Sequence, residues 1–139
     1  MALDLYARIP AHAREHLPPA LAHSKFVGTW PHLGFHRFRV RLAQAEGFDL
    51  DRMEGFQDEG ESRLAPPRSW MSVQTPLKPL LNHSDANGSL SRADCAAMYQ
   101  RLREVAAQWP EDDYDRVQAE RLAVGMEAVA EFGGRIDFR

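Results

Sequence analysis

The sequence predicts a single compact α+β domain, mainly helical, with a small sheet that pairs a strand at each end of the chain. Apolar and polar residues alternate over residues 3–9, which is the period of a half-buried strand, and Pro10 ends the run. The alternation recurs over residues 135–139, where Ile136 and Phe138 fall on one side. Between these ends, apolar residues recur at spacings of three and four, which is typical of helices that bury one face.

The first half of the chain predicts one well-defined helix and a long loop. Residues 35–46 carry apolar side chains on one helical face, namely Phe35, Phe38, Leu42 and Ala45. Two helical turns are expected over residues 11–17, and a short turn over residues 48–56. Residues 57–69 are rich in charge, proline and glycine without periodicity, and they predict an exposed loop.

A short helix is expected after Thr75, which is placed to cap it, with Pro76 at the first helical position. Pro79 is expected to make this helix irregular. Further along, Ser91 and Asp94 have the spacing of a capping box, with Asp in place of the usual Glu.

Two longer helices, each with one apolar stripe, are predicted in the C-terminal half. Pro110 stops the first, and its stripe consists of Cys95, Met98, Leu102, Val105 and Trp109. The second begins at Asp112 or Asp113, whose charge favours a helix N-terminus, and Gly133 ends it. Its buried side is expected to hold Leu122, Met126 and Val129.

Length and composition are those of an ordinary globular protein. The 139 residues, 44% hydrophobic and 27% charged, suit one domain over 1–139 that buries a core without the help of disulfides or metals. A net charge of -3 gives no reason to expect nucleic acid or an anionic membrane as partner. The lone cysteine, Cys95, excludes an intramolecular disulfide and suits a reducing compartment. With no apolar signal-peptide core near the start and no membrane-length apolar stretch, the expected location is the cytoplasm.

Residues 83–94 have the pattern of a degenerate EF-hand calcium loop. Gly88 falls at the sixth position, where such loops make a sharp turn, and Leu90 takes the usual aliphatic position. His83 stands in place of the first Asp, and Asp94 in place of the closing Glu. The candidate metal ligands are His83, Asp85, Asn87, Ser89, Ser91 and Asp94.

The chemistry of these ligands predicts weak calcium binding or none. Calcium takes about six to eight oxygen ligands, and a closing Glu usually supplies two of them. Asp94 has a shorter side chain, and the ring nitrogen of His83 suits softer metals better. EF-hand loops usually work in pairs, and the sequence holds no second one. The alternative is that residues 85–88 form an Asx-type turn that leads into a capped helix without any metal.

The residues around this loop resemble a recurrent segment of small uncharacterised bacterial and phage-borne proteins. The likeness rests on residues 80–85, on 87–90 and on the helix that carries Cys95, and residues 34–39 and 3–6 are similar too. It covers about half of the chain in patches and implies a common fold, with no assigned chemistry. It also favours His83 as a regular feature of the loop. The resemblance to EF-hand proteins is confined to the twelve loop residues.

Two histidine pairs have a spacing that is found in zinc sites, although so short a pattern also occurs often by chance. His12 and His16, with Glu15 beside the second, have the order of an inverted zinc-protease motif. His32 and His36 are also four residues apart. The flanking prolines leave under two helical turns around the first pair, so a solvated polar turn is the favoured interpretation. For the second pair, a helix N-terminus is favoured over a ligand pair.

Cys95 and three arginines are candidates for a reactive thiol and a nucleic-acid contact, respectively. Cys95 lies in an apolar stripe, where a free cysteine acts as a small hydrophobe more readily than as a nucleophile. Arg37, Arg39 and Arg41 are interpreted as a solvated, ion-paired helix face, with nucleic-acid contact as the less favoured alternative.

Two classes of function remain open, and an enzyme is not expected. The first is a small binding module built on residues 83–94, with Ca²⁺ as the candidate cofactor. The second is a protein-interaction module without a metal role, for instance an inhibitor or an accessory factor of a mobile element. In that case residues 26–30 and Trp70 are candidate contact anchors, because aromatic residues dominate interface energetics. In both cases the partner is a protein or a metal, with no nucleic acid or membrane.

Overall fold

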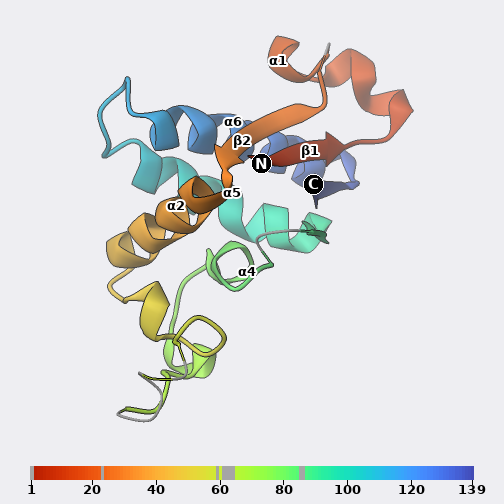
Figure 1. The fold of residues 1–139 in the computed structure, drawn as a ribbon. Helices are drawn as coiled ribbons and strands as arrows, with labels where there is room; N and C mark the ends of the chain where they lie inside the picture. The colour runs from red at the N-terminus through yellow and green to blue at the C-terminus, as the bar shows by residue number, and fades with distance from the viewer. Residues whose placement is uncertain (1, 23, 59, 61–64, 85–86) are drawn as a thin grey trace.

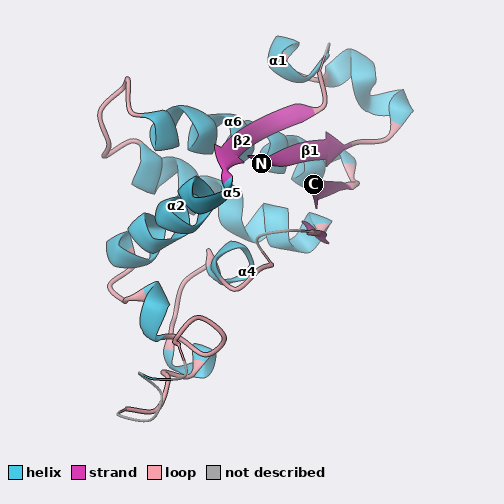
Figure 2. Ribbon diagram, in the orientation of Figure 1, coloured by secondary structure: helices cyan, strands magenta, loops and turns pink. Residues whose placement is uncertain are grey.

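The two ends of the chain meet in one antiparallel sheet. In the computed structural model, which describes residues 2–22, 24–58, 60, 65–84 and 87–139, strand β1 (Ala2–Arg8) pairs with β4 (Arg135–Phe138). Strand β2 (Phe26–Pro31) borders β1 and strand β3 (Gly88–Leu90) borders β4, so the described order is β2-β1-β4-β3. The predicted pairing of the terminal strands is confirmed, and Figure 2 shows β1 and β2 side by side.

The alternation read from the sequence places the correct residues in the core. Leu3, Leu5 and Ala7 of β1 are buried, as are Ile136 and Phe138 of β4. Their polar neighbours along each strand stay partly exposed, because successive side chains of a strand point to opposite faces.

Two strands were not expected from the sequence. Residues 26–30, interpreted as contact anchors, belong to β2, and Trp30 is fully buried instead of available to a partner. Val27, Gly28 and Trp30 are all buried, so buried and exposed positions do not alternate strictly along this strand. Strand β3 is only three residues long and therefore carries no readable period.

The long helices cover the sheet and one another. Helix α5 (Arg92–Ala106) packs along α6 (Tyr114–Phe132), and α6 in turn lies against β2 (Figure 1). Helix α2 (His32–Ala45) follows β2 directly. The shorter helical segments are η1 (Ala11–His16), α1 (Pro19–Ala22), η2 (Leu50–Arg52), η3 (Trp70–Ser72) and α4 (Lys78–Leu81).

The apolar stripes of these helices join one core. Phe35, Phe38 and Leu42 of α2 are buried, and Phe38 stacks on Trp30 with ring centroids 4.4 Å apart. The same hydrophobic cluster takes in buried residues of the sheet and of α5 and α6, in agreement with the single domain that the composition predicts. None of the described helices combines the length and apolar character needed to cross a membrane.

Several predicted helix details need correction. Helix α2 begins at His32 instead of residue 35, and its buried face includes Arg39 and Ala43, whereas Ala45 is exposed. Pro79 does not make α4 irregular, because it lies in the first turn, where the missing N–H has no helical partner to lose.

The other boundaries are close to those expected. Thr75 Oγ1 accepts a hydrogen bond from Leu77 N at 3.1 Å and thus caps the turn before α4. Trp109 lies beyond the end of α5, half-buried against the core. Asp113 is the N-cap of α6, as its charge predicted. Of the predicted loop 57–69, residues 59 and 61–64 lie outside the described residues.

Candidate functional site

The predicted metal loop, residues 83–94, begins just after α4 and ends in the first turn of α5. Strand β3 occupies its middle and pairs with β4, so Leu90 is buried opposite Ile136. Asp85 lies outside the described residues. Asn87, Ser89 and Ser91 are exposed, and Asp94 is half-buried.

Two of the candidate ligands hold the start of helix α5. Ser91 Oγ accepts a hydrogen bond from Asp94 N at 3.1 Å, and Asp94 Oδ2 accepts one from Ser91 N at 3.3 Å. The predicted capping box is therefore confirmed, with the shorter Asp acting in place of Glu. Such a box satisfies backbone N–H groups that the helix cannot pair internally.

His83 is held inside the loop on both ring nitrogens. Nδ1 lies 2.8 Å from the carbonyl oxygen of Ser84, and Nε2 lies 3.1 Å from that of Ser89. A carbonyl oxygen only accepts hydrogen bonds, so a neutral ring donates to one of these oxygens and a protonated ring donates to both. The ring also stacks on Phe138, with centroids 4.0 Å apart.

The Ser89 contact concerns the seventh position of the loop. In an EF-hand loop the backbone carbonyl at that position is a calcium ligand. Here the same oxygen faces the imidazole of His83, the residue at the first position. The side chain that replaces the first Asp therefore takes up an oxygen that a bound cation would need.

Gly88 lets the ring come this close. Its φ is +110°, a conformation that side-chain-bearing residues rarely adopt. A Cβ atom at this position would lie 3.0 Å from Cε1 of His83. The glycine is thus required both by the turn, as the sequence predicts, and by its histidine neighbour.

Arg39 of helix α2 holds the backbone at the start of the loop. Its Nη1 donates to the carbonyl oxygens of Leu81, at 3.4 Å, and of His83. Its guanidinium lies 4.7 Å from the ring centroid of Phe35 and 5.3 Å from that of Phe56. The expected solvated arginine face is wrong at this position, since only 2% of Arg39 is exposed. A buried cation is tolerated here because carbonyl oxygens and aromatic faces compensate its charge.

An open depression of about 410 Å³ lies between the start of the loop, helix α2 and residues 55–56. Arg39 lies at its side, together with His36, Phe56, Asn82 and His83. His36 is oriented by Asp51, whose Oδ1 lies 2.8 Å from Nε2. Within the described ranges, no group of three or more His, Cys, Asp and Glu side chains is arranged to hold a metal ion.

The first of the two zinc-like histidine pairs does not share a helical face. His12, Glu15 and His16 lie in η1, a 3₁₀ helix with about three residues per turn, so residues four apart do not share a face. His16 instead stacks on Phe132, with ring centroids 6.1 Å apart. The side chain of His32 lies outside what the structure describes, and His36 pairs with Asp51.

Cys95 and Arg41 have the structural roles expected of them. Cys95 is fully buried, and burial raises the pKa of its thiol from 9.0 to about 12, with a smaller contribution from the charge of Asp94. Such a thiol stays protonated and unreactive at neutral pH. Arg41 pairs with Asp113 at 2.8 Å and Asp115 at 3.2 Å, and these hydrogen bonds raise the pKa of its guanidinium.

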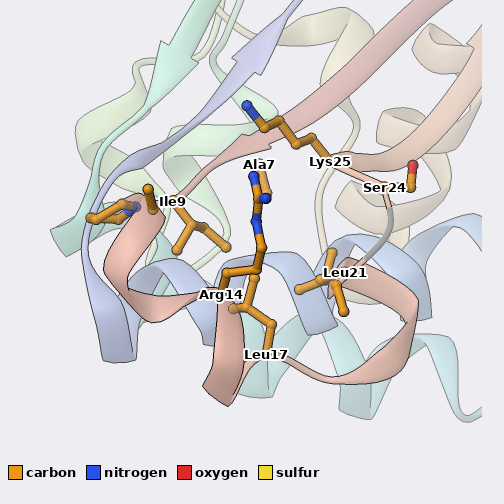
Figure 3. A pocket seen from close by; sticks show the side chains of 10 residues that line it. Ala7, Ile9, Arg14, Leu17, Leu21, Ser24 and Lys25 are labelled. Carbon is orange, nitrogen blue, oxygen red and sulfur yellow. The ribbon is translucent and has the colours of Figure 1, made fainter.

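A second candidate site has no recognisable motif in the sequence. A pocket of about 380 Å³ lies where β1, η1 and α1 meet, and Figure 3 shows the side chains that line it. Arg14 and Lys25 border it, over apolar walls that include Ile9, Leu17 and Leu21. No motif connects Arg14 with Lys25, because only the turn from β1 back to β2 brings them to one pocket.

The chain matches no protein-family model, no curated protein and no solved structure.

Proposed function

We propose that the protein is a small non-enzymatic binding module whose loop 83–94 is EF-hand-like and closes without metal. The observation that carries this proposal is the contact between Nε2 of His83 and the carbonyl oxygen of Ser89, at 3.1 Å. When the proton is on Nε2, the ring N–H replaces one of the interactions that a cation makes in such loops. The loop then keeps its shape with weak affinity for Ca²⁺ or none.

Local geometry at several loop positions supports the EF-hand-like interpretation. Gly88 at the sixth position has a positive φ, and Leu90 at the eighth is buried in a strand pair. Ser91 at the ninth position and Asp94 at the twelfth cap the following helix. Asp85, Asn87 and Ser89 remain as further candidate ligands of a weakly bound ion.

Weak affinity follows from what a cation must displace. Calcium must break the His83 contact to reach the Ser89 carbonyl, and Asp94 must keep its capping role while it coordinates. The expected affinity is therefore no tighter than about 10⁻⁴ M.

A titration followed by thermal unfolding tests this proposal. A ligand that binds the folded state alone stabilises it by about 1.4 kcal/mol at ten times its Kd. Millimolar Ca²⁺ should thus raise the melting temperature by a few degrees at most, and Asp85→Ala should remove that rise. Mg²⁺ controls for charge screening, and Zn²⁺ tests whether the imidazole prefers a softer metal. Submicromolar Ca²⁺ affinity would contradict the proposal.

A pair of variants at His83 makes the test sharper. His83→Asp supplies the missing carboxylate and frees the Ser89 carbonyl, so its Ca²⁺ affinity should exceed that of the parent by at least about tenfold. His83→Asn frees the same carbonyl without the charge and should gain less. Equal affinities for the parent and both variants would show that His83 does not limit binding.

The second candidate, a protein-interaction module such as an inhibitor or an accessory factor of a mobile element, is favoured by exposed apolar side chains. Met71 is 87% exposed in η3, and Leu33 is 64% exposed in α2. Trp70, the proposed anchor beside Met71, packs against Phe48 with ring centroids 6.0 Å apart. It would therefore hold Met71 in position, and Met71 would make most of the contact with a partner.

Crosslinking in the native host tests this second candidate. A specific protein should be trapped by the parent chain and lost with Met71→Glu or Leu33→Glu, while the melting temperature stays unchanged. An exchange of Arg37, an exposed residue of α2, to Glu serves as the charge control. If Met71→Glu and Leu33→Glu trap the same protein as well as the Arg37→Glu control does, a role for these apolar side chains is contradicted.

A further inference from the structure

The pocket between β1, η1 and α1 combines cationic side chains with apolar walls. Figure 3 shows Arg14 extending from its helix in the direction of Ala7 and Lys25, with Ile9 on one side and Leu21 on the other. The ten described residues that line the pocket include no carboxylate. Its volume of about 380 Å³ is within the usual range for small-molecule sites.

The two cations are without a partner in the described part of the chain. The side chains of Arg14 and Lys25 make no hydrogen bond or ion pair with any residue described. Several arginines elsewhere pair with carboxylates, for example Arg8 with Asp137 at 3.0 Å and Arg116 with Glu120 at 2.7 Å. A pocket with two unpaired positive charges, on a chain of net charge -3, attracts an anion locally.

Hydrogen bonds fix the segment that carries Lys25 and Ser24 before any ligand arrives. The carbonyl oxygen of Lys25 accepts a hydrogen bond from Ala7 N at 2.7 Å, which fixes this residue against β1. Ser24 Oγ accepts one from Phe26 N at 3.2 Å, so its hydroxyl proton can still be donated into the pocket. A segment held in this way loses less backbone freedom when a ligand binds.

The walls select an apolar tail. Ala7 and Leu21 are buried and form the floor, and the half-buried side chains of Ile9 and Leu17 form the walls. A guanidinium can bind a carboxylate through two parallel hydrogen bonds, while the ammonium adds a point charge. A ligand with one charged end and an aliphatic body satisfies both halves of the pocket.

We propose that this pocket binds a small aliphatic carboxylic acid, with the carboxylate at Arg14 and Lys25 and the chain against Leu17 and Leu21. The pocket shares no lining residue with loop 83–94, so this binding is independent of the function proposed above. The C-terminal carboxylate of a peptide with an apolar last residue offers similar chemistry, and the test separates the two sources.

Octanoate is the probe, and amide NMR titration of the intact protein is the readout. Octanoate should shift amides within residues 7–25 with millimolar or tighter affinity. Acetate, which lacks the tail, and octanamide, which lacks the charge, should each bind at least about tenfold more weakly. Equal binding of octanamide, or shifts confined to other parts of the chain, would overturn the proposal.

Substitutions then assign the binding to the cations. Arg14→Gln and Lys25→Gln should each weaken octanoate binding several-fold, and the double variant should abolish it. Both side chains are exposed, so the variants should melt like the parent. Arg37→Gln, an exposed arginine of another helix, should bind octanoate unchanged. Undiminished binding by the double variant would contradict the assignment.

A last titration distinguishes a small free acid from the C-terminal carboxylate of a peptide. N-acetyl-alanyl-leucine should bind more weakly than octanoate, because its amide groups meet apolar walls without partners. Binding of this peptide acid without binding of octanoate would overturn the small-acid proposal and assign the pocket to a peptide C-terminus.

Discussion

The imidazole of His83 lies flat on the ring of Phe138, with centroids 4.0 Å apart and ring planes inclined by 27°. This contact joins the start of loop 83–94 to strand β4 of the sheet. Phe138 in turn packs edge-on against Phe35 of helix α2, at 5.8 Å between centroids. The loop is therefore attached to the hydrophobic core through its histidine.

Gly88→Ala should destabilise the fold by more than the cost of its backbone conformation alone. The positive φ costs a residue with a Cβ about 1 kcal/mol, and the added atom would also press on His83 at 3.0 Å. Gly47→Ala is the matched control, since Gly47 has a φ of +89° and open space around it. Denaturant unfolding should show a larger loss at position 88, and equal losses would mean that the histidine yields freely.

Gly125→Ala should destabilise the protein even though alanine favours helices. A Cβ at Gly125 of α6 would lie 2.6 Å from Cγ1 of Val27, on the strand that the helix covers. Overpacking of this kind costs about 1–3 kcal/mol, against a helix-propensity gain of about 1 kcal/mol. The double variant with Val27→Ala should recover part of the loss, and additive effects in that cycle would argue against close contact.

Asp113→Ala should cost about 0.5–2 kcal/mol of stability near neutral pH, because it removes the N-cap of α6. The Asp113 carboxylate also accepts a hydrogen bond from Arg41 at 2.8 Å, which is the main cause of its lowered pKa. A carboxyl with a lowered pKa stabilises the fold above its ordinary pKa of 3.8, and this contribution is lost as the pH falls further. The difference between parent and variant should therefore narrow below about pH 4, and a difference that stays constant in acid would contradict the ion pair.

Cys95 should resist alkylation in the folded protein and react only after unfolding. The thiol is fully buried, and burial raises its pKa to about 12. An unfolded chain releases this proton near pH 9.0 while the folded chain retains it, so the free energy of unfolding should decrease as the pH rises above that value. Cys95→Ala should show a shallower alkaline decrease, and rapid labelling of the native thiol would show that the helix opens readily.

Local sequence patterns predicted much of the helical structure correctly. The capping box of Ser91 and Asp94 and the N-cap Asp113 depend on residues within one helical turn, so their chemistry is visible in the sequence. The stripe from Cys95 to Val105 is equally readable, because a helix repeats its buried face at short intervals. The terminal strands were found for the same reason, through their period of two.

The role of each candidate site residue depended on distant partners. His83 could be recognised as a departure from a calcium loop, but its contacts with Ser89 and Phe138 follow from the pairing of β3 with β4. Arg39 was assigned to the wrong surface, since the carbonyl groups that hold it come from residues well beyond its own helix.

The sequence by itself determined the fold class, the long helices, the pairing of the terminal strands and the turn at Gly88. The tertiary structure decided the extra strands, the contact between His83 and the carbonyl oxygen of Ser89, and the pocket at Arg14 and Lys25. Caps and periodic burial are set by neighbours along the chain, whereas strand partners, stacked rings and pockets arise only where separate segments are brought together by burial of one common core.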